Sequence, residues 1–145
     1  MSYMTLRSAA TAGRRAVLVR VPGRRQARGA RLPAHLSDTE SMALRALAAR
    51  KASLGGRVRE MRLFGSRARG VAHPHSDLDV AVRVRGRRDA ALERAIVMAF
   101  ADVEWGPPLE GALRLSPLVI FEDAARAAVM ANIEREGITL WKAGA

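Results

Sequence analysis

The chain has 145 residues, no cysteine and a formal net charge of +11, with 49% apolar and 27% charged residues. Its length and composition are those of one globular domain with a hydrophobic core, and no apolar run approaches the roughly 20 residues of a membrane-spanning helix. The lack of cysteine excludes disulfides and thiolate metal sites and fits a reducing compartment, so we expect a cytoplasmic protein.

The positive charge is concentrated in residues 1–35, which contain eight arginines and no Asp or Glu. The remaining residues hold 17 basic and 14 acidic groups, so we place a nearly neutral domain at residues 36–145. Gly and Pro interrupt the basic arm, which predicts a mostly disordered extension with one short strand over residues 16–21. Three interpretations of the arm stay open: an extension without function, a nucleic-acid-binding arm, which is not favoured, and an organelle transit peptide.

The domain begins with the signature of a helix N-terminus. Ser37 is followed three residues later by Glu40, which is a capping box, and apolar residues then recur at helical spacing as far as Gly55. A strand is predicted next over residues 58–64, running into a glycine turn. The segment 76–84 alternates apolar and polar residues, which predicts a second strand with one apolar face.

Helices and strands continue to alternate after this point. Apolar spacing predicts a helix over residues 89–105, packed by one face. A strand is predicted over residues 112–121, and Pro117 places it at a sheet edge or a bulge. A last helix over residues 122–136, with Val129 and Ile133 facing inward, precedes a short strand over residues 138–141. This order predicts a single α/β (α+β) domain with a mixed central sheet and flanking helices.

Two carboxylates and a glycine turn carry the chemistry. Asp77 and Asp79 would share one face of a strand, roughly 6–7 Å apart along the backbone. They would repel each other unless a cation lay between them, and Mg²⁺ prefers one or two carboxylates together with phosphate oxygens. Ten residues before them, Gly65–Ser66 offers a close backbone approach and a hydroxyl for phosphate, and Arg67 and Arg69 add positive charge. The sequence therefore predicts phosphoryl or nucleotidyl transfer.

The same residues resemble the G-S-x(10)-D-x-D signature of the minimal nucleotidyltransferases of the DNA polymerase β-like superfamily. The longer pattern GSRARGxAxxxSDxDxxV matches from Gly65 to Val82. This resemblance covers roughly residues 36–141 and implies a palm-like domain that binds Mg²⁺ and a nucleoside triphosphate, for which we expect ATP. It implies Asp77 and Asp79 as catalytic metal ligands, and as nucleotide-binding residues Gly65, Ser66, Arg67, Arg69 and Ser76.

One departure from the family pattern leaves two hypotheses open. The resemblance implies a third carboxylate on the strand over residues 112–121, but this strand contains no Asp or Glu. Glu110 precedes it, Glu122 and Asp123 follow it, and none of the three is assigned. If one of them lies near Asp79, an enzyme is favoured, and if all three face solvent, a binding module is favoured.

The first hypothesis is an enzyme that transfers a nucleoside monophosphate to an acceptor hydroxyl. The resemblance suggests that it acts as the antitoxin partner of a HEPN-type toxin, and an antibiotic, a protein hydroxyl and an RNA end all stay open as the acceptor. The second is a catalytically weak nucleotide-binding module that acts by docking to a partner protein.

Overall fold

The chain folds around a four-stranded sheet in the order β5-β4-β3-β6. The strands are β3 (Val58–Phe64), β4 (Leu78–Val84), β5 (Leu115–Phe121) and β6 (Ile138–Lys142). Strand β4 pairs antiparallel with β3 and parallel with β5, and β3 pairs antiparallel with β6. The sheet is therefore mixed, and β5 is an edge strand, as Pro117 indicated. The computed structural model describes residues 3–6, 17–20, 31–73, 75–124 and 127–144.

Helix α1 (Asp38–Ala49) begins at the predicted capping box. The Glu40 N–H donates to the Ser37 hydroxyl, and the Ser37 N–H donates to the Glu40 carboxylate. Helix α2 (Lys51–Leu54) continues the chain as far as Gly55. Because the cap satisfies N–H groups that the first turn leaves without a partner, it fixes where α1 starts.

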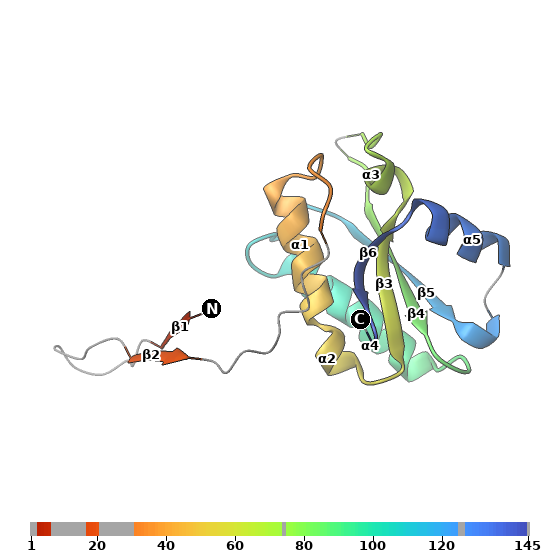
Figure 1. Ribbon diagram of the computed structural model, residues 1–145, viewed down its shortest axis with the longest axis horizontal. Helices are drawn as coiled ribbons and strands as arrows, with labels where there is room; N and C mark the ends of the chain where they lie inside the picture. Colours follow the sequence, from red (N-terminus) through yellow and green to blue (C-terminus); the bar gives the residue numbers. More distant parts are fainter. Residues whose placement is uncertain (1–2, 7–16, 21–30, 74, 125–126, 145) are drawn as a thin grey trace.

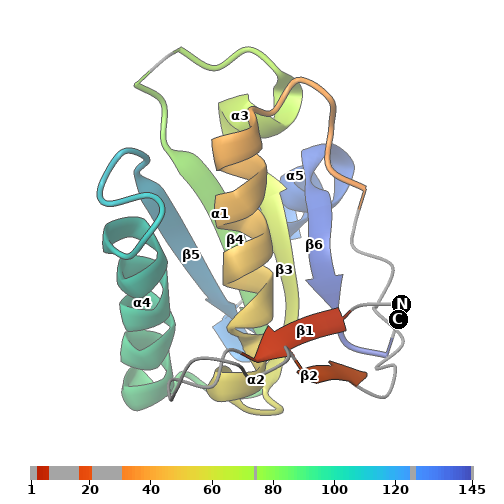
Figure 2. The same cartoon turned by 90° about the vertical axis from the view of Figure 1, so that its left-hand side faces the viewer.

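The apolar face of the central strand β4 forms the core. Its residues Leu78, Val80, Val82 and Val84 are fully buried, and they belong to the same hydrophobic cluster as residues of α1 and of helix α4 (Ala90–Trp105). Figure 2 shows both helices in front of the sheet. The predicted alternation is therefore confirmed. Because side chains alternate along a strand, Asp79 lies on the opposite face of the sheet.

Helix α5 (Ala127–Glu136) lies on that opposite face, after a short 3₁₀ turn at Glu122–Ala124 (Figure 1). Ile133 is buried, as predicted, but Val129 is 40% exposed, so the prediction that it faces inward is wrong. The reason is that Val129 lines a groove over the edge strand β5, together with Leu118 and Met130, where the sheet ends. The sheet, with α1 and α4 on one face and α5 on the other, forms a single α+β domain.

The basic arm contains two short strands. Strand β1 (Tyr3–Leu6) pairs antiparallel with β2 (Val17–Arg20). Strand β2 falls within the predicted strand over residues 16–21, whereas β1 was not predicted. The other expectations for the arm concern residues 1–2, 7–16 and 21–30, which lie outside the described residues, and the domain boundary at residue 36 stays a prediction. Within the described part of the chain, no helix combines the length and apolar character needed to cross a bilayer.

Candidate functional site

The end of β3 and the start of β4 lie side by side at one end of the sheet. Phe64 pairs with Asp79 in the antiparallel register, and Gly65 then opens the short helix α3 (Gly65–Arg69) with a φ of 75°. A Cβ atom on Gly65 would lie 2.6 Å from Asp79 Oδ2. Glycine is needed here because it adopts this φ without steric cost and leaves room for the carboxylate. The predicted phosphate turn therefore lies against a predicted metal ligand.

Asp77 lies close enough to Asp79 to affect the pKa of the Asp79 carboxyl group. Asp77 directly precedes β4, and Asp79 is the second residue of that strand. Burial raises the pKa of Asp79 above its ordinary 3.8, the charge of Asp77 raises it further, and a hydrogen bond from the Ser116 hydroxyl opposes the shift. A partly buried pair of like charges is an arrangement that a divalent cation would stabilise.

The three acidic residues considered as a third carboxylate are all exposed. Glu110 is exposed in the turn after α4. Glu122 and Asp123 are exposed beyond the far end of β5, six or more residues past the position that pairs with Asp79, which corresponds to about 20 Å along a strand. No group of three or more His, Cys, Asp or Glu side chains within the described ranges is arranged to hold a metal.

Ser116 occupies the place on β5 that faces the carboxylates. It pairs with Asp79 in the parallel register of β4 and β5, and its hydroxyl donates a hydrogen bond to the Asp79 carboxylate. The partner of Asp79 on β5 is thus a hydroxyl and not a third carboxylate. Sequence inspection missed Ser116, because its role depends on which residues of two separate strands pair.

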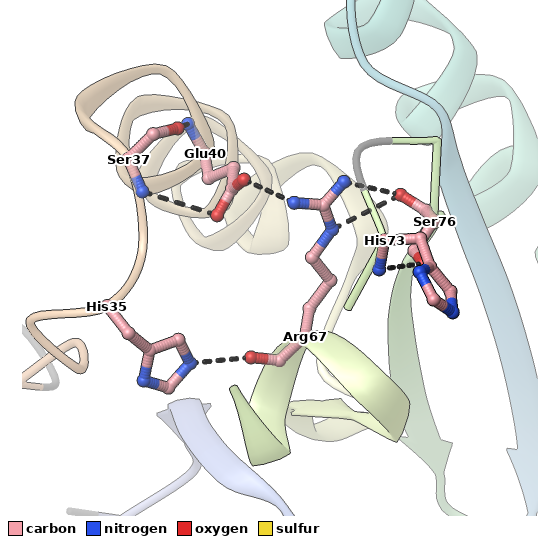
Figure 3. Close-up of polar contacts among 6 residues, drawn as sticks. All are labelled: His35, Ser37, Glu40, Arg67, His73 and Ser76. Atoms are coloured by element: carbon pink, nitrogen blue, oxygen red, sulfur yellow. Dashed lines mark hydrogen bonds and ion pairs between the residues drawn. The ribbon is translucent and has the colours of Figure 1, made fainter. Parts of the chain in front are cut away.

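Arg67, one residue after the glycine-serine turn, connects three segments (Figure 3). Its Nη1 donates to Glu40 Oε1 at 2.6 Å, and its Nε and Nη2 donate to the Ser76 carbonyl at 3.2 and 2.8 Å. The Arg67 and Glu40 side chains are 11% and 10% exposed. The Ser76 hydroxyl accepts a hydrogen bond from the His73 N–H at 2.9 Å. Two residues predicted to bind nucleotide, Arg67 and Ser76, therefore contact each other.

The remaining predicted residues, Ser66 and Arg69, both belong to α3. Ser66 is partly exposed in its first turn, and Arg69 is exposed and forms an ion pair with Glu136 of α5 at 3.1 Å. His35, which was not predicted, has its Nε2 atom 2.7 Å from the Arg67 carbonyl (Figure 3). The structure therefore brings together the turn, both aspartates, Arg67 and Ser76, whereas Arg69 lies toward α5.

This arrangement of a glycine turn and a carboxylate pair on a mixed sheet agrees with the comparisons with known proteins. Residues 44–134, more than half of the chain, match the family model described as the nucleotidyltransferase domain. The chain therefore belongs to the nucleotidyltransferase domain family. No curated protein sequence matches it.

Several solved structures are similar to the chain. One contains a tri-AMPylated HEPN toxin of Shewanella oneidensis in complex with an MNT antitoxin; the matched chain is 16% identical, with 70% of this chain and 71% of that chain covered and a TM-score of 0.48. Another is a toxin-antitoxin complex with AMP-PNP, at 20% identity, with 67% and 74% covered and a TM-score of 0.46.

Proposed function

We propose that this protein binds a nucleoside triphosphate, with ATP as the expected one, together with Mg²⁺ at the segment from Gly65 to Asp79. The observation that carries the proposal is the close approach of the Asp79 carboxylate to Gly65, where a Cβ atom would lie 2.6 Å from Asp79 Oδ2. It puts a phosphate turn and a metal ligand within reach of one triphosphate. In this proposal the Gly65–Ser66 turn binds phosphate oxygens.

The two aspartates fit a divalent cation. Asp77 and Asp79 are hard oxygen ligands. Burial and, after it, the charge of Asp77 raise the pKa of Asp79, and a bound cation would offset both effects by stabilising the ionised carboxylate. Mg²⁺ bound there would neutralise charge on the phosphates. The cation and the triphosphate are therefore expected to bind together, each strengthening the binding of the other.

The reaction we propose is transfer of a nucleoside monophosphate to an acceptor hydroxyl. The acceptor oxygen attacks the α-phosphorus, the bond to the bridging oxygen breaks, and pyrophosphate leaves while the acceptor loses its proton. The chain's own residues hold the triphosphate at the turn and orient the α-phosphorus toward the face of the sheet on which Asp79 lies. This placement of the reacting groups supplies a large part of the rate in phosphoryl transfer.

Titration calorimetry tests the binding proposal. ATP with Mg²⁺ should bind the wild-type protein and should bind Asp79→Asn far more weakly, because the variant lacks one of two metal-ligating charges. Omitting Mg²⁺ should weaken binding to the wild type and change little in the variant. Equal affinity of both proteins for ATP with Mg²⁺ would show that Asp79 does not hold the cation.

A second function, nucleotide binding without turnover, is favoured by two observations. The first is that Glu110, Glu122 and Asp123 are all exposed. The second is that Ser116, rather than a carboxylate, is the partner of Asp79 on β5, and a neutral hydroxyl is a far weaker general base than a carboxylate. Such a module would act by docking to a partner in its nucleotide-bound state. Single-turnover transfer from ATP labelled at the α-phosphate separates the two functions, because only the enzyme would label an acceptor.

Two variants make that experiment decisive. Transfer that is lost in Asp77→Ala and retained in Glu110→Ala would establish catalysis that does not need Glu110. Nucleotide binding without any transfer, in the presence of cell lysate as the acceptor source, would favour the binding module.

The acceptor that we propose is a protein hydroxyl. The sequence resemblance suggests a HEPN-type toxin as partner and as the protein that is modified. Label on one protein band of the lysate would support a protein acceptor, whereas label on RNA alone would contradict it.

A further inference from the structure

We infer that Arg67 and Glu40 form a positioning pair for this site, an inference that rests on the proposed function. The Arg67 guanidinium lies between α1, the start of α3 and the residue before Asp77. It joins the segment that would hold phosphate to the segment that would hold the cation. Arg67 then acts on nucleotide binding through the placement of Asp77, not by touching the phosphates.

The contacts of the guanidinium explain why we do not assign it to phosphate. Its Nη1 is bound to the Glu40 carboxylate at 2.6 Å, and its other two nitrogens bind the Ser76 carbonyl. Turning Arg67 toward a phosphate would leave the Glu40 carboxylate, which is 10% exposed, without its cation. A buried charge without a partner is strongly unfavourable, so this rearrangement is disfavoured.

Glu40 serves two structural elements with its two carboxylate oxygens. Oε2 accepts the Ser37 N–H of the α1 capping box, and Oε1 accepts from Arg67. Helix α1 is therefore connected directly to the site, although its sequence contains none of the predicted site residues. Ser76 is fixed from its other side as well, because its hydroxyl accepts the His73 N–H.

A lysine could not replace Arg67 in this arrangement. The planar guanidinium directs separate N–H groups at a carboxylate and a carbonyl at the same time, whereas an ammonium is a compact charge at the end of a flexible stem. We therefore expect Arg67→Lys to keep the positive charge and to lose the placement of Ser76 and Asp77.

The direction in which Glu40→Gln changes the affinity for ATP with Mg²⁺ tests the inference. A glutamine keeps a side-chain oxygen for the capping box but loses the charge that holds Arg67. If Arg67 is a positioning residue, Glu40→Gln and Arg67→Lys each raise the Kd for ATP with Mg²⁺ about 10-fold or more. The Kd of the double variant is then no higher than the higher of the two single-variant Kd values, because both changes break the same interaction.

The opposite result would assign Arg67 to phosphate. Glu40→Gln would then release a guanidinium from a competing carboxylate, so ATP would bind as tightly as to the wild type or more tightly, while Arg67→Lys alone would weaken binding. That pattern overturns the inference.

Two controls separate positioning from a loss of stability. Glu136→Gln removes the partner of Arg69 on the same short helix, and because that pair is exposed, ATP affinity should change less than about 2-fold. Ile96→Val lowers stability from the core of α4, away from the site, and should leave the Kd for ATP unchanged.

Amide hydrogen exchange distinguishes failure of this inference from failure of the proposed function. If the wild-type protein binds no nucleotide, the proposed function fails. The positioning role of the Arg67–Glu40 pair is then tested by hydrogen exchange alone. Faster exchange of the His73 and Ser76 amides in both Glu40→Gln and Arg67→Lys, and not in Glu136→Gln, supports the positioning of this segment. Unchanged exchange in the first two variants overturns it.

Discussion

Ser116 lies opposite Asp79 in the parallel register of β4 and β5, and its hydroxyl donates a hydrogen bond to the Asp79 carboxylate. The position on β5 from which a third carboxylate could share a cation with Asp79 is thus held by a neutral group. A site with two carboxylates is equipped to hold one divalent cation together with a triphosphate, and less equipped to hold two.

Introducing a carboxylate at this position should strengthen cation binding. We expect Ser116→Asp to bind Mn²⁺ on the order of tenfold more tightly than the wild type, because ligand charge tunes affinity. Titration calorimetry with Mn²⁺ alone measures this without reference to catalysis. Asparagine has nearly the same size as aspartate but no charge, so Ser116→Asn should show no gain in Mn²⁺ affinity. A gain in both variants would mean that size rather than charge is responsible.

Adding a methyl group at Gly65 should displace Asp79. Gly65→Ala places a Cβ 2.6 Å from Asp79 Oδ2, at a φ of 75°. Gly70→Ala is the matched control, because Gly70 has a φ of 74° but a Cβ there would meet its nearest atoms, those of His35, at 3.5 Å. Both variants should carry a backbone cost of about 1 kcal/mol. We expect only Gly65→Ala to lose ATP binding, measured by calorimetry.

The charge of Asp79 should make stability depend on pH. The pKa of Asp79 is raised, so the folded protein holds this proton more tightly than the unfolded chain does. This contribution to stability is complete below the ordinary value of 3.8 and is lost as the pH rises through the folded-state pKa. Near neutral pH the ionised carboxylate therefore opposes folding.

Asp79→Asn should remove this cost. Without divalent cations, the variant should unfold at a higher temperature than the wild type at pH 7, and the difference should vanish as the pH falls below about 3.8. Thermal unfolding in the presence of EDTA measures the difference at pH 7 and its disappearance at low pH. A wild type that is more stable than the variant at pH 7 would contradict the predicted sign.

The buried carboxylate of Glu60 should matter for stability and not for nucleotide binding. Glu60 is 2% exposed and lies 3.0 Å from Arg62 Nη1 and 3.2 Å from Arg83 Nη1. We expect Glu60→Ala to lower the free energy of unfolding by about 3–5 kcal/mol, because it leaves two arginines without their shared partner. Glu136→Ala, at an exposed pair, should cost less than about 1 kcal/mol. Urea unfolding compares the two.

Local sequence patterns predicted the elements of the domain well. The capping box at Ser37 and the alternation along β4 depend only on neighbouring residues, and both predictions are confirmed. Pro117 predicted an edge position or a bulge for a similarly local reason, and β5 is an edge strand. The spacing of Val129 predicted burial wrongly, because what covers a helical face depends on where the sheet ends.

The candidate site was predictable only where it is continuous in sequence. Gly65 and Asp79 belong to one short motif, so their proximity followed from the pattern. The contact of Arg67 with Glu40 spans 27 residues, and that of Asp79 with Ser116 depends on the pairing of two strands. Such contacts require the tertiary arrangement, which periodicity and motif spacing do not contain.

The connection between β3 and β4 has a consequence for the order of folding. Thirteen residues separate Phe64 from Leu78, whereas 73 separate Phe64 from Ile138 of β6. Closing the shorter loop costs about 1.5 kcal/mol less chain entropy, so the antiparallel pair that contains the turn and the aspartates is favoured to form before β6 joins the sheet. Substitutions in the connection should then change mainly the folding rate, and those in β6 mainly the unfolding rate.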